Sequence, residues 1–142
     1  MVTEKRRERR LKVRLPISIS YPDSPPIYAQ TENISRLGTY AGIEQEIPLG
    51  VHLDIVIEIP AYSNDSSLTG NVRCRGDVFR CSLTREVEAR RIYGLGIFFT
   101  DFFSEEDRNK LSKYIDFLII KEQEDIKQGI KRWREKRRKR QG

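Results

Sequence analysis

A two-residue hydrophobic period recurs between residues 15 and 100 of this chain and constrains its fold most strongly. Apolar side chains occupy every second position in short segments that turn-forming residues separate. Such alternation is typical of strands with one buried face. The clearest segments cover residues 15–21, 52–59 and 93–99, and weaker ones cover 27–34, 39–45, 67–75 and 77–85. Six or seven short strands with no helix between them predict an antiparallel barrel or sandwich.

The period changes at Ser104, where we expect a helix to begin. Ser104 supplies a capping hydroxyl, and the three acidic residues that follow lie near the positive end of the helix dipole. We expect the helix to break or fray near residue 128, because Gly129 costs about 1 kcal/mol in a helix interior. Lys136 to Arg140 is then a mobile basic run. Apolar residues recur at helical spacing at Leu111, Ile115, Leu118, Ile119, Ile126, Ile130 and Trp133.

Charge divides the chain into three parts. Residues 1–14 carry a net charge of +5 and residues 127–142 a net charge of +8, whereas residues 15–126 carry −7. A general nucleic-acid binder tends to have a basic patch on its folded face, but here the basic residues lie at the two ends. We predict a basic arm over residues 1–14, a β domain with its following helix over 15–120, and a basic helical tail over 121–142.

Several classes of protein are disfavoured. No apolar run exceeds four residues, which is too short to cross a bilayer, and the N-terminus lacks the apolar stretch of a secretory signal. The only histidine, His52, lies on the polar face of a predicted strand without evident catalytic partners, and no phosphate loop of the Gly-x-x-x-x-Gly-Lys type is present. We therefore predict a soluble, cytoplasmic protein that is not an enzyme and holds no metal or cofactor.

The two cysteines do not have the spacing of a metal site. Cys74 and Cys81 flank Gly76-Asp77, which we interpret as a hairpin turn. Across that turn the two sulfur atoms would be diagonal neighbours, farther apart than a relaxed disulfide prefers. We predict two reduced thiols.

Two short motifs precede and follow the first predicted strand. The first is an arginine pair at the spacing Arg-x-x-x-Arg, directly before Leu15-Pro16-Ile17. The second is Asn33-Ile34-Ser35-Arg36-Leu37-Gly38, at the end of the second predicted strand. Taken singly, the arginines are typical of a solvated tail, and the second motif is typical of a strand-end turn held by side-chain hydrogen bonds.

In this order and spacing the two motifs resemble the PilZ domain family. The segment 51–59 after Pro48-Leu49-Gly50 and the glycine-containing strand from Tyr93 to Phe99 are similar to the family as well. The resemblance covers about residues 6–120. It implies a mainly β fold, a six-stranded antiparallel β-barrel with a C-terminal α-helix. It also implies a non-catalytic receptor that binds the bacterial second messenger cyclic di-GMP and regulates motility or biofilm formation.

The same resemblance implies the site residues. Arginine suits this ligand because its planar guanidinium matches both a phosphate and the O6/N7 edge of guanine. Arg6 and Arg10 fit the motif spacing as well as Arg10 and Arg14 do, and we favour the latter pair because Arg14 adjoins the first strand. Asn33 stands where the family more often has Asp, and we expect altered affinity there. We expect Gly38 to turn with positive φ and to let the ligand approach. The predicted cyclic di-GMP site comprises Arg9, Arg10, Arg14, Asn33, Ser35 and Gly38.

Two alternatives to the receptor remain open. One is a nucleic-acid-binding module that uses its basic termini, and the other is a ligand-free PilZ-like platform for protein contacts. For the receptor, we expect residues 1–13 to be too polar to pack on the barrel, so that ligand orders this arm and presents a surface to an effector protein. The stripe of Ile126, Ile130 and Trp133 serves output or assembly through a protein partner or a homo-oligomer, with membrane contact at most peripheral.

Overall fold

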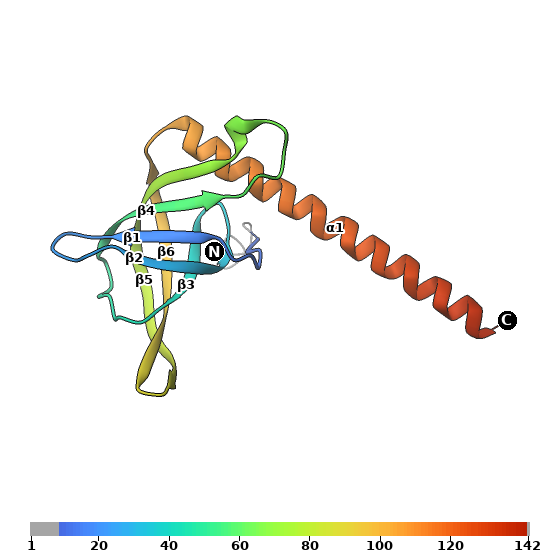
Figure 1. Ribbon diagram of the computed structural model, residues 1–142, viewed down its shortest axis with the longest axis horizontal. Coiled ribbons are helices and arrows are strands. Elements are labelled where there is room, and N and C mark those ends of the chain that lie inside the picture. Colours follow the sequence, from blue (N-terminus) through green and yellow to red (C-terminus); the bar gives the residue numbers. More distant parts are fainter. Residues whose placement is uncertain (1–8, 142) are drawn as a thin grey trace, which may run out of the picture.

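The computed structural model describes residues 9–141, in which six strands form a barrel and one long helix extends from it (Figure 1). A short 3₁₀ helix, Ser66–Leu68, precedes the fifth strand. The strands are β1 (Pro16–Ser20), β2 (Ile27–Ile34), β3 (Gly38–Ile43), β4 (His52–Ile59), β5 (Gly70–Val87) and β6 (Arg90–Phe102), and the helix is α1 (Glu105–Gln141).

The six strands close into an antiparallel barrel in the order β1-β2-β3-β6-β5-β4. β1 closes it by pairing with both β2 and β4. The interior is filled by the apolar members of the alternating segments, as the sequence predicts. Buried side chains on successive strands include Ile17, Ile19, Ile34, Leu53, Ile55, Ile57, Val72, Leu95 and Ile97. A barrel leaves no unpaired sheet edge, so every strand can be short without exposing its backbone.

The hairpin predicted at Gly76-Asp77 is wrong. β5 runs without a turn from Gly70 to Val87, and the turn to β6 lies at Glu88 and Ala89, whose φ values are 49° and 67°. Gly76 is present because the strands pack closely there, with a bulge in the pairing beside it. A Cβ at Gly76 would lie 2.8 Å from the carbonyl oxygen of Phe98.

The two cysteines therefore lie on one strand and not across a hairpin, and both are free thiols, as predicted. Cys74 is buried in the core, whereas Cys81 is partly buried. Burial, with a smaller contribution from the Asp107 carboxylate, raises the pKa of the Cys74 thiol to about 12. Cys74 is thus a packing residue that stays protonated at physiological pH.

α1 begins where the sequence predicts. The Ser104 hydroxyl accepts a hydrogen bond from the Asp107 backbone N–H at 3.1 Å and donates one to its carboxylate at 2.8 Å, which caps the first turn. Leu111, Tyr114 and Ile115 are buried against the barrel. Within residues 9–141, no helix is both long and apolar enough to span a membrane.

The break expected near residue 128 does not occur. α1 continues through Gly129 to Gln141, and the basic run that was expected to be mobile forms its last turns. Gly129 has no neighbouring atom within 4 Å that a side chain would meet. Its cost of about 1 kcal/mol does not interrupt a helix in which the neighbouring Lys, Gln and Arg residues are good helix formers.

The segment before β1 packs on the barrel, contrary to expectation. The Leu11 backbone N–H donates to the Ile34 carbonyl at 2.9 Å, and the Ile34 N–H donates to the Leu11 carbonyl at 3.0 Å. The Leu11 side chain is 4% exposed. A single apolar residue, paired with Ile34, is enough to hold this segment on the barrel. The expectation that the arm cannot pack is therefore wrong at Leu11. Residues 1–8 of the predicted arm lie outside the described residues.

Candidate functional site

The predicted site residues other than Arg9 lie beside the outer face of β3 and β6 or of the neighbouring strands β1 and β2. Gly38, Tyr40 and Gly42 share this face, because alternate residues of a strand point the same way. They pair with Phe98, Gly96 and Gly94 of β6. Two hollows lie toward the two ends of this face, one beside Gly38 and the other beside Gly42.

The first hollow, called the Arg10 hollow, has a volume of about 370 Å³. It brings the two sequence motifs together, since Arg10 comes from one motif and Ser35 and Gly38 come from the other. The Arg10 guanidinium lies 5.9 Å from the centre of the Phe79 ring, within cation–π distance. The hollow is lined by Arg10, Ser35, Leu37, Gly38, Phe79, Ile97 and Phe98.

Ser35 holds the turn between β2 and β3. Its hydroxyl accepts hydrogen bonds from the backbone N–H groups of Leu37 and Gly38, at 3.1 and 3.3 Å. Its own N–H donates to the Gly38 carbonyl at 2.9 Å. The turn interpretation of this motif is therefore correct for Ser35, and the turn itself forms one wall of the Arg10 hollow.

The positive φ predicted for Gly38 is wrong, and the packing of the strands gives another reason for a glycine there. Its φ is not positive, since the only glycines with positive φ among residues 9–141 are Gly50 and Gly70. A Cβ at Gly38 would lie 2.2 Å from the Ile97 carbonyl oxygen, so the close approach of β3 to β6 excludes any side chain. Gly96 acts similarly on the outer face, where the Phe79 ring lies over it.

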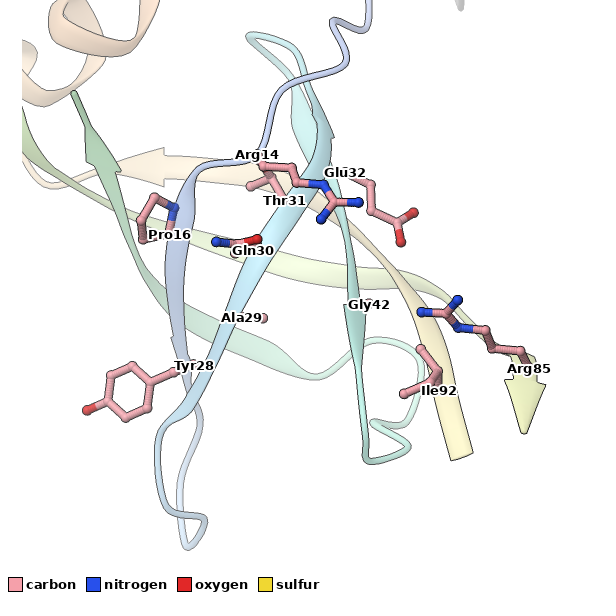
Figure 2. A pocket seen from close by; sticks show the side chains of 10 residues that line it. All are labelled: Arg14, Pro16, Tyr28, Ala29, Gln30, Thr31, Glu32, Gly42, Arg85 and Ile92. Carbon is pink, nitrogen blue, oxygen red and sulfur yellow. The ribbon is translucent and has the colours of Figure 1, made fainter. Parts of the chain in front are cut away.

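The second hollow, called the Arg14 hollow, has a volume of about 480 Å³. Figure 2 shows the guanidinium groups of Arg14 and Arg85 directed into it from opposite sides, with the Glu32 carboxylate between them. Gly42 and Ile92 form part of its floor. Two cations around one carboxylate leave a net positive hollow that suits an anionic ligand.

Asn33 lies on β2 between Glu32 of the Arg14 hollow and Ser35 of the Arg10 hollow. It pairs with Tyr40 on β3, and its backbone carbonyl accepts a hydrogen bond from the Thr39 hydroxyl at 2.7 Å. The side-chain oxygen Oδ1 is buried and has no hydrogen-bond partner among the described residues. An unsatisfied buried amide oxygen costs about 1–3 kcal/mol, so a donor brought by a ligand would be favoured there.

Two arginines, Arg9 beside the first motif and Arg36 inside the second, contact α1 instead of either hollow. The Arg9 guanidinium forms an ion pair with Glu122. Arg36 donates from Nε to the Ser112 hydroxyl at 3.1 Å and from Nη2 to the Asp116 carboxylate. Both motif segments are thus linked to the helix by an arginine. A groove of about 710 Å³ separates residues 9–13 from the side chains of α1 between Tyr114 and Asp125.

Comparison with known proteins points to the same family as the sequence motifs. A model of the PilZ domain matches residues 4–117. This chain belongs to the PilZ domain family. The family assignment confirms the predicted resemblance. The strand order confirms the predicted six-stranded barrel, and the chain ends in the predicted C-terminal helix. A comparison with curated proteins gives no match.

Solved PilZ structures share the fold at low sequence identity. The PilZ domain of YcgR from Escherichia coli with cyclic di-GMP is 15% identical, with a TM-score of 0.57 over 87% of this chain and 98% of that chain. The K. pneumonia MrkH complex with cyclic di-GMP is 16% identical, with a TM-score of 0.64 over 83% and 53%. The Bacillus subtilis inhibitor of motility, MotI, is 17% identical, with a TM-score of 0.62 over 82% and 52%. This chain therefore spans about half the length of MrkH and MotI.

The structure of this PilZ chain distributes the predicted residues over three places. Arg10, Ser35 and Gly38 share one hollow, Arg14 lines the other, and Asn33 lies between them. Arg9 lies apart from both, beside α1.

Sequence reasoning missed the aromatic wall of the Arg10 hollow. Phe79 and Phe98 are 47% and 49% exposed although they lie on strands. Phe98 could have been found, because it occupies a position that the alternation of β6 assigns to the outer face. Phe79 was hidden by the misplaced turn at Gly76-Asp77.

The titratable residues His52, Glu44 and Glu46 lie outside both hollows. His52 Nδ1 lies 2.5 Å from the Asp77 carboxylate on the exposed side of β4 and β5, away from both hollows. Glu44 and Glu46 are exposed. No group of three His, Cys, Asp or Glu side chains within residues 9–141 could hold a metal ion.

Proposed function

We propose that this chain is a non-catalytic cyclic di-GMP receptor whose ligand lies on the outer face of β3 and β6. The convergence of the two motifs in the Arg10 hollow carries this proposal. Membership of the PilZ family and the likeness to the YcgR and MrkH domains, both solved with cyclic di-GMP, support it. Family membership is also the reason for assigning no catalytic activity.

Each hollow offers what one half of the ligand needs. Arg10 and Arg14 can each bind a phosphate or the O6/N7 edge of a guanine, and each lines one of the two hollows. Phe79 and Phe98 give the Arg10 hollow an aromatic wall against which a guanine can stack. Asn33 stands where the family more often has a carboxylate; it lines neither hollow, so its buried oxygen can accept a hydrogen bond from a guanine N–H only after its side chain turns toward the ligand.

Isothermal titration calorimetry with cyclic di-GMP tests this assignment. We expect binding by the native chain and a loss of about ten- to a hundredfold for Arg10→Ala or Arg14→Ala, because a hydrogen bond to a charged group contributes about 1.5–3 kcal/mol. Arg90→Ala is the matched control, since Arg90 is an exposed arginine paired with Glu44 outside both hollows. No heat from the native chain at high micromolar ligand contradicts the proposal.

We further propose that Arg9 relays ligand binding to α1. In the relay predicted from the sequence, ligand binding orders the whole N-terminal arm. Leu11 is already packed on the barrel, so any change on ligand binding is restricted to the residues before it. Ligand phosphates would compete with Glu122 for the Arg9 guanidinium. Binding would then release this contact and leave α1 free for an effector protein.

Removing the competitor should strengthen ligand binding. An exposed ion pair contributes about 0.2–1 kcal/mol, so Glu122→Gln should raise cyclic di-GMP affinity about two- to fivefold. Glu124→Gln is the control, because Glu124 is an exposed acid on the same helix without a contact to Arg9. Equal affinities for the two variants contradict the relay while leaving the receptor assignment intact.

The remaining biological predictions concern context. We propose a cytoplasmic receptor that acts on motility or biofilm formation through an effector protein. The exposed stripe of Ile126, Ile130 and Trp133 is available to that effector. Light scattering with and without cyclic di-GMP tests the alternative of a second copy of the chain, because only self-association changes the molar mass of the isolated chain.

A further inference from the structure

The C-terminal end of α1 carries an unusual density of positive charge. Residues 127–139 contain eight basic side chains and one acidic side chain, Glu135. All of these side chains are exposed, and none of the basic ones forms an ion pair with a described residue. Figure 1 shows this part of the helix projecting away from the barrel. The fold therefore neither neutralises nor covers these charges.

The arrangement of the charges around the helix disfavours a membrane surface. Successive residues of an α-helix are rotated by about 100°, so the basic residues between Lys131 and Lys139 are spread around the whole circumference. A helix that lies in a membrane interface needs one continuous apolar face. Here Arg137 falls on the same face as Ile130 and Trp133, and its guanidinium lies 5.0 Å from the centre of the Trp133 ring.

Self-association of this segment is disfavoured by the same charges. Two copies packed side by side would bring seven net positive charges on each helix into proximity. A polyanion with charge on more than one side of the helix is the complementary partner. Duplex DNA provides it, because its major groove is about 12 Å wide between two phosphate backbones and an α-helix with side chains is about 10–12 Å across.

We propose that residues 127–139 of α1 bind duplex DNA through its phosphates, without sequence preference. Thirteen helical residues extend about 20 Å, which is enough to follow one groove crossing. Basic side chains on opposite sides of the helix contact the two phosphate walls. This inference is independent of the dinucleotide site on the barrel.

Fluorescence anisotropy with a labelled duplex of mixed sequence, about 24 base pairs long, tests the proposal on the full chain. Affinity should fall steeply with salt, by about 0.9 logarithmic units per phosphate contact for each tenfold rise in salt. The double variant R138Q/K139Q should lower that slope by about 1.8 and weaken binding at least about tenfold at 0.1 M salt. The matched control R90Q/R91Q removes the same charge from the β5–β6 hairpin and should leave the slope unchanged.

Three outcomes overturn the proposal. One is no binding to the duplex at 50 mM salt, and another is equal slopes for R138Q/K139Q and R90Q/R91Q. The third uses Trp133, the only tryptophan of the chain, whose emission reports directly on this segment. A blue shift with vesicles that contain phosphatidylserine, and no response to the duplex, assigns the segment to a membrane.

Discussion

The two halves of α1 are held in different ways. In the first half, Leu111, Tyr114 and Ile115 are buried against the barrel, and the Tyr114 ring lies 5.1 Å from that of Tyr62 in the loop after β4. In the second half, Ile126 and Trp133 are 52% and 58% exposed. Tertiary packing thus fixes the first half, whereas only local helix preference supports the second. One continuous helix therefore contains a half that is packed on the barrel and a second half, the free half, whose side chains are available for binding.

The two halves should differ most in the loss of unfolding free energy that follows truncation of a single isoleucine. Ile115→Ala should lower the free energy of unfolding by about 2–5 kcal/mol, because it leaves a cavity in the core. Ile126→Ala makes the same chemical change on an exposed surface and should shift it by no more than about 0.5 kcal/mol. Urea unfolding followed by circular dichroism measures both. Equal losses would mean that the second half is packed in solution.

A smaller effect is expected where the second motif meets the first half of α1. Arg36→Gln should lower the free energy of unfolding by about 1 kcal/mol, because it weakens contacts with Ser112 and Asp116 that are partly exposed. Arg134→Gln, in the free half, should have no effect. A double-mutant cycle with Asp116→Asn measures the coupling directly, and purely additive losses would show that Arg36 and Asp116 do not interact.

The smallest effect concerns Gly129, in the free half. Gly129→Ala should stabilise the helix locally by about 1 kcal/mol and increase helical circular dichroism. The urea midpoint of the barrel should stay unchanged, since no atom of the barrel lies within 4 Å of this position. A raised midpoint would show that the two halves unfold together.

Much of the fold could be predicted because alternation records which face of a strand is buried. The limits predicted for β2 agree with the structure, and the helix start at Ser104 follows from local capping chemistry. Two of the errors occur at glycines. Gly76 looks like a turn in the sequence, but it makes room for β6; Gly129 looks like a break, but the residues around it maintain the helix.

The site was harder to predict than the fold. Family resemblance selected Arg10, Arg14, Ser35 and Gly38, which line the two hollows. The spacing alone could not place Arg9 against Glu122, a contact across 113 positions of the chain. Leu11 looked like an isolated apolar residue in a charged segment, and only its register with Ile34 explains its burial. Contacts of this kind depend on tertiary structure and leave no periodic pattern in the sequence.

Amide chemical shifts of the nine glycines test the central claim most directly. Gly38, Gly42, Gly94 and Gly96 lie on the outer face of β3 and β6, whereas Gly129 lies in the free half of α1. In a titration of the ¹⁵N-labelled chain with cyclic di-GMP, we predict that the first four resonances shift and that Gly129 does not. Unchanged resonances on the barrel face, or a shift confined to Gly129, would contradict a cyclic di-GMP site on this face.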